Sequence, residues 1–107
     1  MGEVKDLINS SKFENNNINN LNIEDFRNEY EFTGNTINNI SNSNIKSSIK
    51  NNTINTISET SNIYAPFQNN TITGSIINSD FNNTCDGNYI YGNIKNSYLG
   101  VFVDNTI

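Results

Sequence analysis

The chain has 107 residues, with 6 basic and 11 acidic side chains and a formal net charge of −5. It contains no His, so it lacks the usual general base and the commonest metal ligand. The single Cys85 excludes an intrachain disulfide and a Cys-rich zinc site. The few scattered basic residues argue against binding to a nucleic-acid backbone, and no apolar run suffices for a membrane-spanning helix. We therefore expect no cofactor, metal, nucleic-acid partner or membrane insertion, and we expect no enzyme activity.

Asn occupies 26 of the 107 positions, a composition that is also typical of disordered chains. Leu, Ile, Val and Phe together make up 28 residues, which is about a quarter of the chain. Chains that fail to fold usually fall below roughly 20% in these four residues. The composition therefore favours a folded chain.

Residues 1–31 form an acidic N-terminal segment that lacks the apolar stretch of a signal peptide. Asn22 is a candidate N-cap, and Ile23, Phe26 and Tyr30 would share one face of a short helix that follows it. One interpretation is a solvated helix or turn. The other is an attachment segment that docks the chain onto a partner through these three side chains.

Residues 32–107 are repetitive. The tripeptide Asn-Thr-Ile begins at positions 35, 52, 55, 70 and 105, and the starts at 35, 55, 70 and 105 are separated by multiples of five, with the copy at 52 out of phase. Apolar residues in the same phase are the predicted structural repeat core: Phe32, Ile37, Ile57, Phe67, Ile72, Ile77, Phe102 and Ile107. A period of five matches neither an α-helix nor a simple sheet.

Such a period suits an all-β fold, a β-solenoid (β-helix), in which each short strand points one or two side chains inward and then turns a corner. Ile and Phe would fill the interior, since both favour strands. Asn suits the corners because it tolerates left-handed backbone, and Asn side chains can also stack in ladders on successive coils.

The sequence resembles two known groups. Three consecutive segments look like pentapeptide repeats, which form a four-sided right-handed β-helix: Ser11–Asn15, Asn16–Asn20 and Leu21–Asp25. Other segments are similar to Asn-Thr-Ile/Phe-rich β-helical repeats in bacteriophage fibres and appendages, and in some bacterial surface proteins: Asn51–Ile54, Asn69–Gly74 and Asn82–Thr84. The second resemblance spans roughly 32–107. It implies a structural, often trimeric, particle component and carries over no catalytic or binding residue.

The number of coils favours association of several chains. At roughly 20 residues per coil, the repeat region would supply fewer than four coils, and solenoids need several stacked units with covered ends. We therefore expect a homo-oligomer, with an intertwined or stacked trimer first and a head-to-tail filament second. Other structural proteins of the particle would be its further partners.

These observations predict a structural component of a virus (phage) particle, a non-catalytic rod on the virion or an extracellular surface, anchored by its N-terminal segment. The alternatives are a self-assembling extracellular filament or adhesin repeat of a cell, and a pentapeptide-type β-helix that binds a protein partner.

Few residues in the repeat region are candidates for chemistry. Its acidic residues are interpreted as solvated surface: Glu59, Asp80, Asp86 and Asp104. Cys85 is expected to be a small core or surface residue, with an interchain disulfide as the alternative. The tyrosines at positions 89, 91 and 98 are expected to pack on strands rather than to form a carbohydrate-contacting patch, since strand packing is the commoner role.

Overall fold

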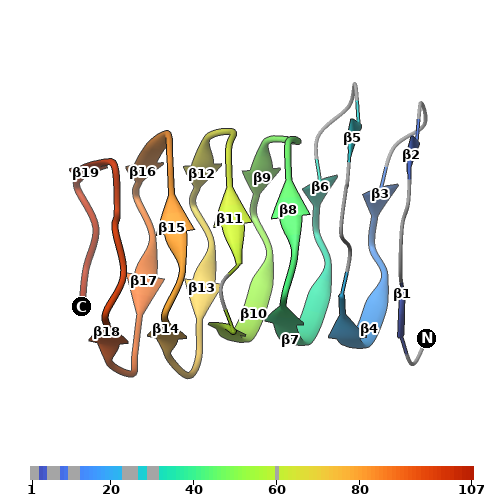
Figure 1. Cartoon of the computed structure of the whole chain (residues 1–107), viewed down its shortest axis with the longest axis horizontal. Coiled ribbons are helices and arrows are strands. Elements are labelled where there is room, and N and C mark those ends of the chain that lie inside the picture. Colours follow the sequence, from blue (N-terminus) through green and yellow to red (C-terminus); the bar gives the residue numbers. More distant parts are fainter. Residues whose placement is uncertain (1–2, 5–7, 10–12, 23–26, 29–31, 60) are drawn as a thin grey trace.

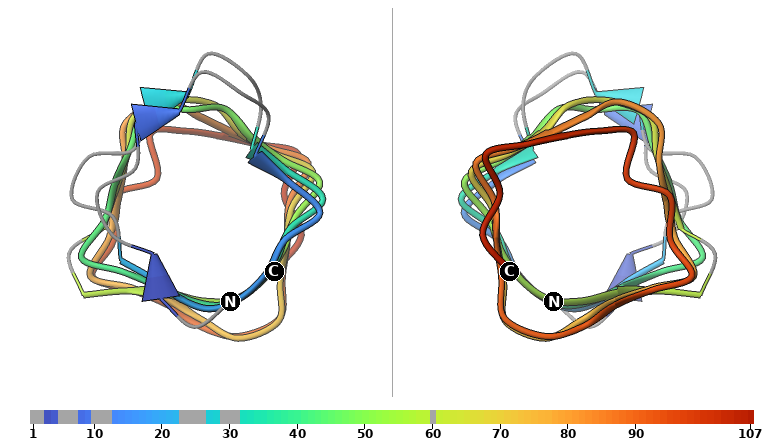
Figure 2. Two further views of the ribbon diagram at one scale, coloured as in Figure 1. Left: turned by 90° about the vertical axis from the view of Figure 1, so that its right-hand side faces the viewer. Right: turned by 90° about the vertical axis from the view of Figure 1, so that its left-hand side faces the viewer.

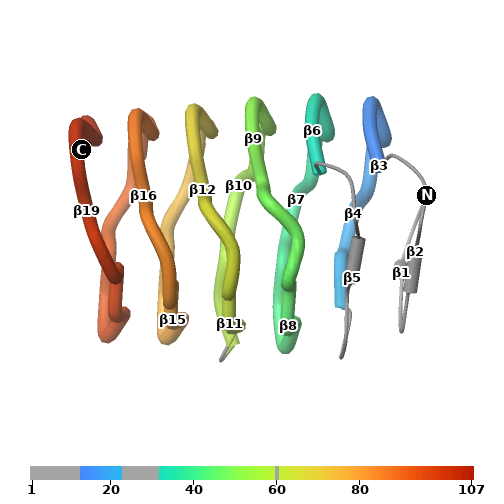
Figure 3. Tube along the Cα trace, turned by 90° about the horizontal axis from the view of Figure 1, so that it is seen from above, coloured from blue at the N-terminus to red at the C-terminus, as the bar shows by residue number. Residues whose placement is uncertain are grey.

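The computed structural model describes residues 3–4, 8–9, 13–22, 27–28, 32–59 and 61–107. These residues form short parallel strands and no helix. The chain winds in successive coils, and the coils lie side by side along one axis (Figures 1 and 3). Viewed along the axis, each turn passes around a common centre (Figure 2). The predicted all-β solenoid is confirmed.

One broad sheet runs along the whole axis. Its strands are paired in parallel in the order β1-β4-β7-β10-β13-β17, with β14 joining β10 to β18. The bounds are β1 (Glu3–Val4), β4 (Asn17–Leu21), β7 (Thr36–Ser41), β10 (Thr53–Ser58), β13 (Thr71–Ile72), β14 (Ile76–Ile77), β17 (Tyr89–Ile90) and β18 (Ile94–Lys95).

In the part of the chain that the structure describes, three further sheets complete the turns. The second has the order β19-β16-β12-β9-β6-β3, the third β15-β11-β8, and β2 pairs with β5. Their bounds are β2 (Ile8–Asn9), β3 (Phe13–Glu14), β5 (Arg27–Asn28), β6 (Phe32–Thr33), β8 (Asn44–Ile45), β9 (Ile49–Lys50), β11 (Asn62–Ile63), β12 (Phe67–Gln68), β15 (Asp80–Phe81), β16 (Thr84–Asp86) and β19 (Val101–Val103).

The core consists of four columns of inward side chains, each built from one residue per coil. The columns are Phe13, Phe32, Ile49, Phe67 and Cys85; Ile18, Ile37, Ile54, Ile72 and Ile90; Leu21, Ile40, Ile57, Ile76 and Ile94; and Ile45, Ile63, Phe81 and Leu99. Aromatic rings add edge and tilted contacts, with ring centroids 4.7 Å apart between Phe13 and Phe32. One chain supplies all four columns, so closing the core does not require three interlocked chains.

The spacing of the columns explains the five-residue period in the sequence and shows why that period does not hold along the whole chain. From the first column to the second the chain always advances five residues, as from Phe32 to Ile37 and from Phe67 to Ile72. The steps between the other neighbouring columns are three to six residues long, because the corners differ in length. Residues paired in register on adjacent coils are 17 to 19 residues apart in the sequence. The true repeat is therefore the coil.

Five of the predicted core residues are buried: Phe32, Ile37, Ile57, Phe67 and Ile72. The prediction is wrong for Ile77, which is only partly buried because its neighbour Ile76 occupies the inward position. It is also wrong for Phe102 and Ile107, which are 37% and 71% exposed. Phe102 keeps the register of its column, opposite Cys85, but no described coil packs on its other side.

The predicted helix after Asn22 is wrong at Arg27–Asn28, which form strand β5 and pair in parallel with β2. Ile23, Phe26 and Tyr30 lie outside the described residues. Strands β3 and β4 pair with β6 and β7, so the solenoid extends to the N-terminal side of residue 32. The predicted boundary at residue 32 thus does not coincide with a change of fold. No described helix is long and apolar enough to cross a bilayer.

Candidate functional site

A six-residue pattern recurs once per coil and organises the molecule. It reads apolar residue, any residue, Asn/Gly/Asp, Asn, any residue, Ile. Its copies are Phe13–Ile18, Phe32–Ile37, Ile49–Ile54, Phe67–Ile72, Cys85–Ile90 and Phe102–Ile107. The first and last residues of the first five copies occupy two neighbouring inward columns. The Asn between them forms a ladder of side chains inside the solenoid.

The asparagine ladder consists of Asn16, Asn35, Asn52, Asn70, Asn88 and Asn105. The middle four are at most 2% exposed. At Asn52 the carboxamide Oδ1 accepts the backbone N–H of Asn35 at 2.8 Å and one of its Nδ2 hydrogens at 3.0 Å. The Asn52 Nδ2 donates to Oδ1 of Asn70 at 3.0 Å.

A third bond ties each ladder residue from Asn35 to Asn105 to the coil before it. Nδ2 of Asn52 donates to the carbonyl oxygen of Phe32 at 2.9 Å, and the same bond joins Asn70 to Ile49 and Asn88 to Phe67. From Asn35 to Asn88, each carboxamide therefore bonds the coil before it and the coil after it. A buried backbone N–H without a partner is costly, and the ladder supplies that partner at a corner where the strand pairing is interrupted.

The residue before each ladder Asn has left-handed backbone. The φ angles lie between 52° and 68° at Asn15, Gly34, Asn51, Asn69, Gly87 and Asp104. These residue types tolerate that conformation best, which is why this position holds no branched or bulky side chain. At Gly87 an added Cβ would lie only 2.5 Å from Oδ1 of Asn69 in the previous coil. The prediction that Asn lies at left-handed corners is confirmed.

A second polar corner uses serine. Ser43, Ser61 and Ser79 are buried, and the backbone N–H of Ser79 donates to Oγ of Ser97 at 3.2 Å. The hydroxyls of Ser43 and Ser79 donate to the carbonyl oxygens two residues earlier in the chain.

The phase assigned to the Asn-Thr-Ile copies is wrong in one respect. The copy at 52 belongs to the ladder, whereas Asn55 is exposed on the outer face of β10. Asn52 lies one coil, 17 residues, after Asn35 and so falls outside the five-residue phase, whereas Asn55 lies 20 residues after Asn35 and falls within it. Alignment of the complete six-residue pattern would have found all the ladder positions.

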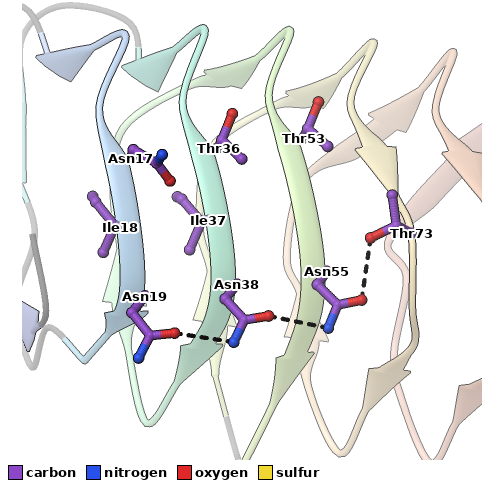
Figure 4. A pocket seen from close by; sticks show the side chains of 9 residues that line it. All are labelled: Asn17, Ile18, Asn19, Thr36, Ile37, Asn38, Thr53, Asn55 and Thr73. Atoms are coloured by element: carbon purple, nitrogen blue, oxygen red, sulfur yellow. Dashed lines mark hydrogen bonds between the residues drawn. The ribbon is translucent and has the colours of Figure 1, made fainter.

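A groove of about 460 Å³ lies on the outer face of the broad sheet. Its nine lining residues are Asn17, Ile18, Asn19, Thr36, Ile37, Asn38, Thr53, Asn55 and Thr73. Along one side Asn19, Asn38, Asn55 and Thr73 form a hydrogen-bonded row, with Nδ2 of Asn38 donating to Oδ1 of Asn19 at 3.1 Å (Figure 4). The hydroxyls of Thr36 and Thr53 line the other side (Figure 4).

Two tyrosines continue the rows of the groove. Tyr89 is the register partner of Thr71, and Tyr91 follows two residues later on the same outer face. They are 54% and 72% exposed, and Tyr98 is 60% exposed. The expectation that these tyrosines pack on strands is wrong, because all three point most of their surface into solvent. The groove itself was not predicted. The outward positions two residues apart on each strand were the available signal.

The remaining candidates do not form a cluster. Glu59, Asp80 and Asp104 are exposed and Asp86 is partly buried. Among the residues that the structure describes, no group of three or more metal-ligating side chains lies together. Cys85 is a free thiol in the first inward column, 3% exposed, and burial raises its pKa to about 12. The core alternative for Cys85 is confirmed.

Comparisons with protein-family models, with curated proteins and with solved structures find no match to this chain.

Proposed function

We propose that this chain is a non-catalytic structural rod, a component of a fibre or appendage of a virus (phage) particle, anchored by its acidic N-terminal segment. The observation that carries the proposal is the unbroken asparagine ladder from Asn16 to Asn105. Every coil from Asn16 onward is bonded to its neighbours through buried side chains as well as through backbone. A stack joined in this way resists bending and stretching along its axis.

The assembly proposed for this rod is a homo-oligomer, and a trimer is the preferred form. Its chains would pack against one another rather than intertwine. The single chain already fills its own core, as the buried columns show. Chains would then contact one another through outer faces. The virion or an extracellular surface would be its location.

A second candidate is a self-assembling extracellular filament or adhesin repeat. It is favoured by the exposed apolar side chains of β19, where Val101 and Val103 are 59% and 41% exposed beside Phe102. Apolar surface grouped in this way marks an association site. The fibre and the filament share a fold and differ in whether the assembly has a fixed size.

Native mass measured by light scattering after size-exclusion chromatography, over a range of protein concentrations, tests the proposal. The fibre predicts a constant mass of about three times 12.0 kDa. A mass that rises with concentration would contradict the fibre and support the filament. A 12.0 kDa monomer at every concentration would contradict both.

A matched pair of variants separates the two assemblies. Phe102→Asp places a charge among the apolar side chains of β19. Tyr64→Asp places a charge at another exposed aromatic residue, which is 43% exposed and directly follows β11 in a different sheet. A filament that grows through β19 would shorten in Phe102→Asp and persist in Tyr64→Asp. A trimer that contacts through the outer faces would keep its mass in Phe102→Asp.

A further inference from the structure

We propose that the groove on the broad sheet binds a neutral oligosaccharide, which lies along the solenoid axis across β4, β7, β10 and β13. This inference goes beyond the structural role proposed above, and it requires that no second chain covers this outer face. Its starting point is size. The groove has a volume of about 460 Å³, within the range of sites that hold small organic ligands.

The lining of the groove matches the chemistry of sugar hydroxyls. Hydroxyl and carboxamide groups both donate and accept hydrogen bonds, as sugar hydroxyls do. Among the bonds of the described residues, the Asn38 carboxamide donates once to Asn19 and accepts once from Asn55. A carboxamide has two N–H groups and two lone pairs, so Asn38 retains one donor and one acceptor for a ligand.

The absence of charged side chains in the lining favours a neutral ligand. All nine lining residues are Asn, Thr or Ile, and none carries a formal charge. A charged ligand that loses water of hydration in this groove would find no counter-charge among these side chains. A neutral sugar would exchange hydrogen bonds to water for hydrogen bonds to Asn and Thr.

The spacing of the groove suits a polymer of repeating units. Adjacent parallel strands lie about 4.8 Å apart, so each row offers the same kind of group at that interval. The row that begins at Asn19 runs through Asn38 and Asn55 to Thr73. One position further along lies Tyr91, 72% exposed, whose flat ring can cover the apolar C–H face of a sugar.

A second copy of the chain is a poorer occupant of the same surface. Two identical hollow faces placed against each other leave a void, and voids remove packing contacts. The exposed rings of Tyr89 and Tyr91 would also stand between two such faces. Pairing of two copies is therefore an outcome of the test rather than the proposal.

The test is titration of the ¹⁵N-labelled full chain with cellohexaose, maltohexaose and chitohexaose as neutral probes, and with a galacturonate hexamer as the charged probe. We expect at least one neutral probe to shift the side-chain amide signals of Asn19, Asn38 and Asn55. The signals of the buried ladder amides, such as that of Asn70, should stay in place. The galacturonate hexamer should bind at least tenfold more weakly.

Variants locate the binding. Asn38→Ala/Asn55→Ala and, separately, Tyr91→Ala should each weaken the binding of that probe by about tenfold or more. The matched control is Asn62→Ala. Asn62 lies on β11, in a different sheet from the groove, and its carboxamide donates to Asn44 on β8, so this substitution should leave the affinity unchanged. Thermal unfolding of each variant checks its fold. If the double variant unfolds, the affinity of Tyr91→Ala, a substitution at an exposed side chain, tests whether the probe binds at the groove.

Three results would overturn the proposal. One is that no neutral probe shifts the groove amides. Another is that the galacturonate hexamer binds as tightly as the neutral probes. The third is that the Asn38 and Asn55 signals move with protein concentration in the absence of sugar, which would assign this face to a contact between two copies.

Discussion

At the scale of single residues, the fold depends on the buried carboxamides of Asn35, Asn52, Asn70 and Asn88, one in each of four successive coils. The backbone N–H of Asn35 has no strand partner at its corner and is satisfied by Oδ1 of Asn52. Nδ2 of the same side chain also donates to the carbonyl of Phe32. An apolar residue of similar size would leave the Asn35 N–H buried without a partner and would remove the bonds to the neighbouring coils, which explains why each copy of the six-residue pattern has Asn at this position.

Replacement of Asn52 and of Asn55 by Ala compares two Asn residues that each begin an Asn-Thr-Ile tripeptide. We expect Asn52→Ala to lower the free energy of unfolding by about 3 kcal/mol, because it leaves the buried Asn35 N–H without a partner and removes the hydrogen bonds of the carboxamide to both neighbouring coils. Asn55→Ala, at an exposed side chain, should cost less than about 0.5 kcal/mol. Urea unfolding measures both. Equal losses would contradict the assignment of Asn52 to the interior.

The buried thiol makes stability depend on alkaline pH. Burial raises the pKa of Cys85 from 9.0 to about 12, so above pH 9 the unfolded chain loses this proton while the folded chain keeps it. The contribution of the buried, protonated Cys85 thiol to the free energy of unfolding is complete below pH 9. It is lost as the pH rises toward 12, by about 1.4 kcal/mol per pH unit.

Urea unfolding of the native chain and of Cys85→Ala, at intervals from pH 8 to pH 11, measures this contribution. The two chains differ only at position 85, so the difference between the two curves isolates the thiol. We expect the curve of the native chain to fall more steeply above pH 9. Parallel curves would show that the Cys85 thiol is accessible to water.

At the scale of elements, the left-handed corner decides where each strand ends. Asn51 has a φ of 57°, and a β-branched side chain there costs roughly 1–2 kcal/mol. We expect Asn51→Val to destabilise the chain by about that amount, and Asn51→Gly to stay within about 0.5 kcal/mol of the native chain. Thr53→Val, at an extended exposed position of β10, is the control and should be nearly neutral. Thermal or urea unfolding that ranks Val equal to Gly at position 51 would contradict the left-handed corner.

The sequence predicts the solenoid, the Asn corners and the stacking of Asn side chains, because each follows from local preference. It does not predict which Asn is buried, since Asn52 and Asn55 begin the same tripeptide and only the position within the coil separates them. Ile76 and Ile77 are likewise adjacent and equally apolar, and the longer step from Ile72 places Ile76 inside. The groove depends on which outward side chains of separate coils align, and that alignment requires the register.

At the scale of the whole molecule, the cost of a core substitution depends on the position of its coil along the axis. Ile54 and Ile107 occupy the same place in the six-residue pattern but are 0% and 71% exposed. We expect Ile54→Ala to cost about 2–5 kcal/mol and Ile107→Ala less than about 0.5 kcal/mol in the free energy of unfolding. A cost at Ile107 that equals the cost at Ile54 would show that another surface covers Ile107.

The central claim is that one carboxamide per coil is buried and bonded to the next. Hydrogen exchange of side-chain amides, followed by NMR on the ¹⁵N-labelled chain, tests it most directly. We expect the Nδ2 protons of Asn35, Asn52, Asn70 and Asn88 to persist and to show contacts from each to the next, while those of the exposed Asn19, Asn38 and Asn55 exchange rapidly. Equally rapid exchange of every Asn side chain, with no contacts between successive ladder amides, would contradict the asparagine ladder and the coil register built on it.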